Sequence, residues 1–167
     1  MAQIRQLLAK GITGEQGKEK EFQTFEGELM WLCRTRVDLH FHIGMFARFV
    51  RSAGEMQMRW VKQLLRYLSY DPEKGIIPAL GNKLYLHGGS DADWGGDEIS
   101  QKSTSGDYLC LGAMGVITCS SRLQRKVADS STAAETYAAH ELVRKVIEAV
   151  GKLREMGFDV PPPVKLR

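Results

Sequence analysis

The chain has 167 residues, a length that accommodates one or two domains and excludes a large multidomain enzyme. Hydrophobic residues make up 43% of it and charged residues 26%, so the chain has the composition of a protein that builds a core, and whole-chain disorder is excluded. The 23 basic and 20 acidic residues give a net charge of +3, which by itself does not indicate nucleic-acid binding.

No apolar run approaches the roughly 18 residues that a membrane span needs, and the first ten residues lack the apolar core of a secretory signal. We therefore expect an intracellular protein, cytoplasmic or nuclear, that is not secreted and has no membrane partner. The three cysteines (Cys33, Cys110 and Cys119) are too few and too scattered for a disulfide framework, and none begins a C-x-x-C zinc motif.

The first part of the chain predicts helices with a basic exterior. Residues 1–21 are typical of a short helix followed by a linker rich in glycine and charge. Residues 22–70 repeat apolar side chains every three or four positions, which predicts about three helices. Segment 28–70 contains seven basic and three acidic residues. This excess of positive charge is equally compatible with a phosphate-binding surface and with an ordinary solvated surface. The basic residues are Arg34, Arg36, Arg48, Arg51, Arg59, Lys62 and Arg66.

Residues 75–167 predict a sheet with one long helix across it. Short apolar runs separated by glycine-rich turns predict strands at 75–80, 83–87, 108–111 and 116–119, and another strand begins at 164–167. Ser130 and its neighbours offer N-cap hydroxyls for a helix that reaches about Met156. Its apolar stripe, which we expect to lie on the sheet, consists of Ala138, Leu142, Val146, Ala149 and Leu153.

Three carboxylates in this second part could meet. Asp91 and Asp93 follow a predicted strand two residues apart, so they project to the same side, and Glu135 heads the sheet-facing stripe of the long helix. Such a cluster suits Mg²⁺ or Mn²⁺ and metal-assisted phosphodiester hydrolysis. The alternative is that Asp91 and Asp93 are turn residues and that Glu135 is a first-turn acid that favours the helix dipole.

The order and spacing of these motifs resemble the ribonuclease H region of copia-type LTR retrotransposon Pol polyproteins, over about half of the chain. Upstream segments look like the helical stretch that joins the reverse transcriptase to the ribonuclease H in the same polyproteins. The matching segments of the second part are 89–97, 102–106, 111–112, 120–124 and 127–137. Those of the first part are 27–32, 35–38, 48–49 and 60–68.

The resemblance implies a fold and a chemistry. The fold is α/β, an incomplete ribonuclease H-like fold with three antiparallel strands, a long helix and the start of a fourth strand, preceded by the helical segment. Asp91 and Glu135 fall on catalytic, metal-binding positions of the family, and Asp93 on a position that is not an assigned ligand. The implied reaction is two-metal hydrolysis, with two Mg²⁺ or Mn²⁺ ions, of the RNA strand of an RNA/DNA hybrid. The implied partners are that hybrid and the rest of the Pol polyprotein, including its reverse transcriptase.

The sequence also departs from the family pattern. The family uses two further aspartates, the first just after a strand like 164–167, and this sequence holds neither. Because half of the ligand set is missing, we expect little or no ribonuclease activity from the chain alone. The alternative hypothesis is a non-catalytic remnant that binds nucleic acid through the basic helical face.

Overall fold

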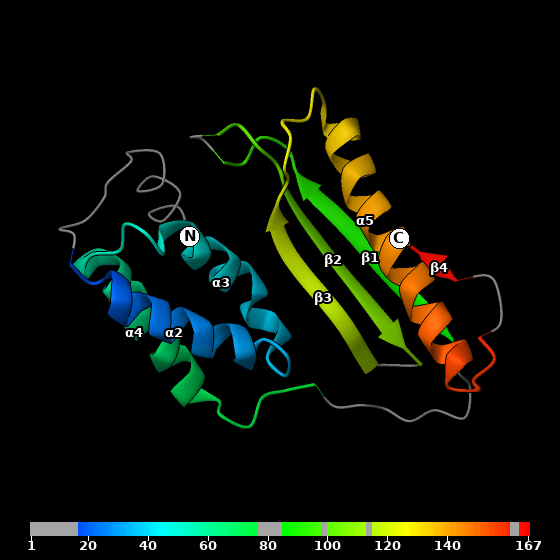
Figure 1. Cartoon of the computed structure of the whole chain (residues 1–167), viewed down its shortest axis with the longest axis horizontal. Coiled ribbons are helices and arrows are strands. Elements are labelled where there is room, and N and C mark those ends of the chain that lie inside the picture. The colour runs from blue at the N-terminus through cyan, green and yellow to red at the C-terminus, as the bar shows by residue number, and fades with distance from the viewer. Residues whose placement is uncertain (1–16, 77–84, 98–99, 113–114, 161–163) are drawn as a thin grey trace. The chain divides into compact units, whose positions relative to one another are not determined.

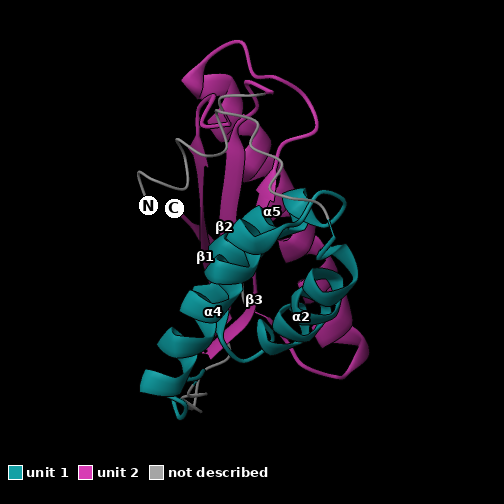
Figure 2. Cartoon of the chain, turned by 90° about the vertical axis from the view of Figure 1, so that its left-hand side faces the viewer, with its two compact units in different colours: residues 1–76 teal, residues 77–167 magenta. Residues whose placement is uncertain are grey.

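A computed structural model describes residues 17–76, 85–97, 100–112, 115–160 and 164–167. The chain divides into two compact units, residues 1–76 and 77–167 (Figure 2). The predicted helix near the N-terminus and most of the predicted strand at 75–80 lie outside the described residues.

In its described residues the first unit contains three helices, α2 (Glu19–Leu32), α3 (His40–Phe46) and α4 (Glu55–Tyr70), with short 3-10 turns at 37–39 and 47–49 (Figure 1). The three helices expected from the apolar repeat are therefore confirmed. The linker ends earlier than predicted, because residues 19–21 already belong to α2.

An aromatic cluster holds these helices together. Phe22 of α2 is fully buried, and its ring centroid lies 5.9 Å from that of Phe46, which in turn lies 6.3 Å from Trp60 of α4. Gln57 is also fully buried, and its side-chain oxygen accepts a hydrogen bond of 2.9 Å from the Gly54 amide at the start of α4. This bond satisfies one of the amides that a helix leaves unpaired at its N-terminus.

In the part of the chain that the structure describes, the second unit is a four-stranded mixed sheet with one helix. The strands are β1 (Leu86–Asp93), β2 (Thr104–Leu111), β3 (Gly115–Leu123) and β4 (Lys165–Leu166), in the order β3-β2-β1-β4. β1, β2 and β3 pair antiparallel, and β4 pairs parallel to β1. The α/β class is thus confirmed. β1 runs over 86–93, so the strand predicted at 83–87 was placed too early. Residues 75 and 76 of the strand predicted at 75–80 are irregular, and the rest of that prediction lies outside the described residues.

Helix α5 (Ser131–Glu155) lies over β1 and β2 (Figure 1). The Ser130 hydroxyl accepts a hydrogen bond of 3.1 Å from the Ala133 amide, which confirms the expected N-cap. Leu142 packs over Gly88, where an added Cβ would come within 3.4 Å of Leu142 and 2.5 Å of the Tyr108 carbonyl oxygen. Glycine therefore lets the helix approach β1 closely.

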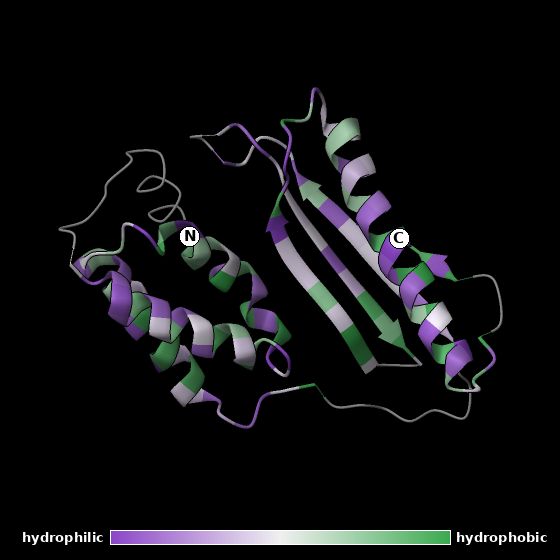
Figure 3. Cartoon of the chain, viewed as in Figure 1, coloured by the Kyte–Doolittle hydropathy of each residue, from purple (hydrophilic) through white to green (hydrophobic). Residues whose placement is uncertain are grey.

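The two halves of the sheet differ in polarity. Apolar side chains gather where β2 ends and β3 begins, and the other half of these strands is more polar (Figure 3). The apolar half forms a core with α5, made of Leu86, Leu109, Leu142, Val146 and Val160. The sheet surface over β3 is not covered by α5, because the helix packs on β1 and β2.

Candidate functional site

Asp91 lies near the end of β1 and is exposed to solvent. It pairs across the sheet with Gly106 of β2. Side chains alternate along a strand, and Gly88 faces α5, so Asp91 belongs to the opposite face of β1. On its other side β1 pairs with β4 only around Gly88, and the last bond runs from the Ser90 amide to the Arg167 carbonyl oxygen at 2.9 Å. Within the described residues, the β1 edge beside Asp91 is therefore open.

Asp93 ends the same strand and is also exposed. Its carboxylate lies where a Cβ on Gly96 would sit, so it packs onto the turn that follows β1. The indole nitrogen of Trp94 donates a hydrogen bond of 3.1 Å to the Ala128 carbonyl oxygen. This bond connects the turn to the loop before α5. These contacts fit the interpretation of Asp93 as a turn residue.

Glu135 is exposed on the first turns of α5. The sequence placed it at the head of the buried stripe, but Ala134, which is fully buried, occupies that position. Helix α5 and strand β1 run in opposite directions (Figure 1). The contact of Leu142 with Gly88 therefore serves as a common reference point from which distances along the helix and along the strand are measured. Asp91 lies three residues beyond Gly88, about 10 Å along the strand, and Glu135 lies seven residues before Leu142, about 10 Å along the helix. The two carboxylates are therefore at the same height, although Asp91 is on the other face of β1.

Within the described parts of the chain, no three His, Cys, Asp or Glu side chains are grouped so as to hold a metal ion. The predicted cluster of three carboxylates is therefore not found in the described residues. The convergence of Asp91 with Glu135 stays a prediction. Their carboxylate oxygens are the hard donors that Mg²⁺ prefers, and this ion commonly binds through one or two carboxylates together with waters and substrate phosphates.

The seven basic residues of segment 28–70 differ in how far they are exposed. Arg59, Lys62 and Arg66 are exposed and lie on one face of α4, because they are three and seven residues apart. Arg34 and Arg51 are exposed outside the helices. Arg48 is partly buried, and Arg36 differs from the expectation altogether, because only 3% of it is exposed.

Arg36 is part of an internal ion-pair network. Its guanidinium donates two hydrogen bonds to the Asp38 carboxylate, of 3.1 and 3.0 Å, and a third of 3.0 Å to the Asp71 carbonyl oxygen. The Tyr67 hydroxyl also donates to Asp38, at 2.7 Å. The bonds from Arg36, followed by that from Tyr67, lower the pKa of Asp38 to about 2. The charge of Arg36 is therefore used inside the unit.

Sequence reasoning missed a second buried ion pair, in the second unit. The Lys145 ammonium of α5 lies 2.5 Å from a carboxylate oxygen of Asp107 in β2, whose side chain is 4% exposed. The Ser120 hydroxyl of β3 donates to the other carboxylate oxygen at 2.7 Å and accepts from Lys145 at 2.8 Å. Asp107 falls before the predicted strand 108–111, so no local pattern predicted its carboxylate inside a sheet.

Comparison with known proteins identifies relatives for most of the chain. It is 34% identical over 145 residues to the "Retrovirus-related Pol polyprotein from transposon RE1" of Arabidopsis thaliana, a match that covers 86% of this chain and 10% of the relative. It is 36% identical over 133 residues to the corresponding polyprotein of transposon TNT 1-94 of Nicotiana tabacum, covering 79% of this chain and 10% of that relative. The "Secreted RxLR effector protein 161" of Plasmopara viticola is 35% identical over 122 residues, which cover 72% of this chain and 85% of the effector.

Over most of its length the chain is homologous, at 34–36% identity, to a segment of retrovirus-related Pol polyproteins from copia-type transposons. It spans 10% of the length of the transposon polyproteins it matches. No protein-family model matches the chain, and no solved structure matches it. None of the helices in the described residues is both long enough and apolar enough to cross a membrane.

Proposed function

We propose that the second unit is a ribonuclease H-like domain that hydrolyses the RNA strand of an RNA/DNA hybrid as part of a larger Pol polyprotein. The observation that carries the proposal is the docking of Leu142 on Gly88, which brings Glu135 to the height of Asp91. The relationship to Pol polyproteins supports it, because those proteins come from transposons.

Asp91 and Glu135 are the proposed metal ligands. Because Asp91 belongs to the face of β1 opposite to α5, both carboxylates could reach one ion only around the strand edge. That edge is the side of β1 away from β2, beyond Ser90, where no described strand pairs with it. A bound Mg²⁺ or Mn²⁺ ion would supply an activated water and neutralise charge on the phosphate. The chain's own contribution is to hold two carboxylates at one height on a rigid strand and helix.

The test is cleavage of a hybrid whose RNA strand carries a label, with Mg²⁺ present. It uses the full chain and a chimera that continues it with the residues that follow the matched segment in the tobacco polyprotein. We expect the chimera to release labelled RNA fragments and the full chain to release few, because the resemblance implies two further aspartates. A chimera that leaves the RNA intact contradicts the proposal.

Two substitutions and two controls assign the cleavage to the site. Asp91→Asn and Glu135→Gln keep shape and remove a charge, and each should reduce cleavage by about 100-fold or more, because removing one member of a catalytic unit costs most of its rate. Asp129→Asn and Glu155→Gln remove the same charges from exposed positions outside the site and should leave the rate unchanged. Equal rates in all four variants would assign the cleavage to a contaminating nuclease.

A second candidate function is nucleic-acid binding by the first unit without catalysis. The exposed face of α4 that carries Arg59, Lys62 and Arg66 favours it. Such binding needs neither carboxylate, so Asp91→Asn leaves it intact, and it weakens steeply with salt as phosphate contacts do. Binding that is absent, or that does not change with salt concentration, removes this candidate.

A further inference from the structure

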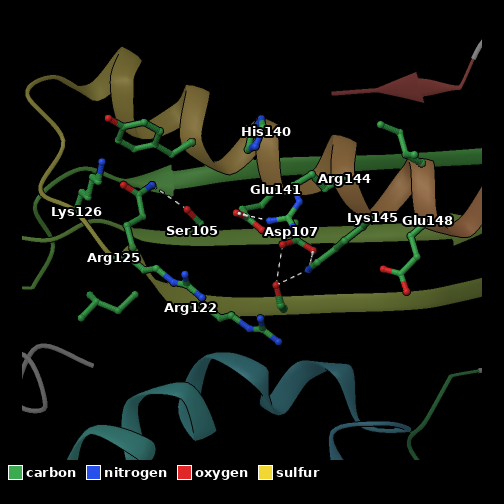
Figure 4. A pocket seen from close by; sticks show the side chains of 15 residues that line it. Ser105, Asp107, Arg122, Arg125, Lys126, His140, Glu141, Arg144, Lys145 and Glu148 are labelled. Carbon is green, nitrogen blue, oxygen red and sulfur yellow. Dashed lines mark hydrogen bonds and ion pairs between the residues drawn. The ribbon is translucent and has the colours of Figure 1, made fainter.

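A groove of about 890 Å³ lies beside α5, over the part of the sheet that the helix leaves uncovered (Figure 4). All of the residues that line it belong to the second unit. Its floor comes from the polar half of β2 and β3, with Ser105, Asp107 and Ser120, and one wall comes from the exposed side of α5.

The groove carries an excess of positive charge at one end. The carboxylates that line it already have cationic partners: Asp107 pairs with Lys145, Glu141 with Arg144, and Glu148 with Lys152. Three other cations line the end where β3 passes into the loop before α5, and these are Arg122, Arg125 and Lys126. All three are exposed, and none forms an ion pair within the described part of the chain.

Ring side chains of α5 also line the groove. Tyr137 is 43% exposed, and His140 lies one turn further along α5 and is also exposed (Figure 4). An exposed ring on a rigid helix is a surface on which a nucleic-acid base can stack. Arginine guanidinium groups, for their part, match phosphate oxygens in a planar fork.

We propose that this groove binds single-stranded nucleic acid, with phosphates on Arg122, Arg125 and Lys126 and a base on Tyr137. Unpaired cations beside exposed rings in an open groove are the combination that single-strand binding sites use. An acidic protein segment is the less suitable ligand, because it would form ion pairs with the cations but would have no group to stack on the rings. The proposal goes beyond hybrid hydrolysis, and it does not involve Asp91 or Glu135, neither of which lines the groove.

The test measures binding of the full chain to a fluorescently labelled single-stranded oligonucleotide of about 12 nucleotides, a length within the range of known single-strand sites. The groove variant replaces Arg122, Arg125 and Lys126 together with glutamine. The control variant replaces Arg154, Lys165 and Arg167, which are three exposed cations of the same unit outside the groove. Both variants change the net charge equally, and circular dichroism checks that both are folded.

Three lost phosphate contacts should lower the slope of log affinity against log salt by about 2. A fourfold increase in salt concentration should therefore reduce the affinity of the parent chain for the oligonucleotide by about 20-fold more than it reduces the affinity of the groove variant. The control variant should keep the parent slope. Tyr137→Leu should weaken binding by about fivefold or more with the salt slope unchanged, because stacking is not an ionic contact.

Equal slopes in the groove and control variants overturn the proposal. So does a hybrid duplex that binds the groove at least as tightly as the single strand, which would make the groove a duplex site. Competition by polyglutamate at equal charge concentration would indicate an acidic protein partner and also overturns it. Asp91→Asn should bind the single strand normally, so a failure of the proposed hydrolysis and a failure of this site are distinguishable.

Discussion

The network around Asp38 gives the sharpest quantitative prediction for the first unit. Asp38→Asn removes the carboxylate that Arg36 and Tyr67 hold and leaves a guanidinium that is 3% exposed without its partner. The pKa of Asp38 falls from 3.8 to about 2, and a difference of about two units corresponds to about 2.5 kcal/mol of stability at neutral pH. We therefore expect the substitution to lower the free energy of unfolding of this unit by about 2.5 kcal/mol.

The sign of the pH dependence follows from the lowered pKa. A carboxylate whose pKa is depressed by folding stabilises the folded state above its unfolded pKa and loses that contribution as the pH falls through the folded value. The difference between the parent chain and Asp38→Asn should therefore be complete above about pH 4 and shrink as the pH approaches 2.

The assay is urea unfolding followed by tryptophan fluorescence in a Trp94→Phe background. This background removes the tryptophan of the second unit, so the buried Trp60 reports on the first. Asp71→Asn is the matched control, because its exposed carboxylate is not part of the network and only its carbonyl oxygen accepts from Arg36. A loss below about 1 kcal/mol for Asp38→Asn, as expected of a solvent-exposed pair, would mean that Asp38 and Arg36 do not form a buried, stabilising ion pair.

Three further tests of the second unit use thermal unfolding, with Trp94 fluorescence as the signal. Leu142→Ala should cost about 3 kcal/mol, because Leu142 is 1% exposed and fills the space above Gly88, and a cost below about 1 kcal/mol would contradict this packing. Lys145→Met should lower the free energy of unfolding by about 3 to 5 kcal/mol, because it leaves the Asp107 carboxylate buried without a partner. Adding Asp107→Leu should restore most of this stability. No recovery would mean that the loss of the ion pair is not the cause. Ser130→Ala should cost about 1 kcal/mol through the lost cap, and Ser130→Asp should restore the stability.

The long helix was predictable because two strong local signals agree. Ser130 offers the cap, and Ala138, Leu142 and Val146 repeat at helical spacing, as the buried stripe confirms. The position of β1 was not predictable, because Gly88, Gly89 and Ser90 have little preference for strands and are paired only through the sheet. Tertiary contacts decided that element, and with it the placement of Asp91 inside a strand rather than after one.

The sequence identified the candidate carboxylates better than it described their surroundings. Residue type and spacing pointed to Asp91 and Glu135, but which face of β1 carries Asp91 depends on a strand register that no local pattern shows. Counting charges placed Arg36 on an exposed face, although its bonds to Asp38 bury it. A charge count cannot separate a cation that pairs inside a unit from one that is available to a phosphate.

Binding of Mn²⁺ to the full chain, measured by electron paramagnetic resonance, shows most directly whether Asp91 and Glu135 share one metal ion. If the two carboxylates hold the same ion, Asp91→Asn and Glu135→Gln should each weaken Mn²⁺ binding, and the double variant should bind little worse than either single one. If the effects of the two substitutions simply add, or if neither changes the affinity, the carboxylates do not share an ion and the account is contradicted.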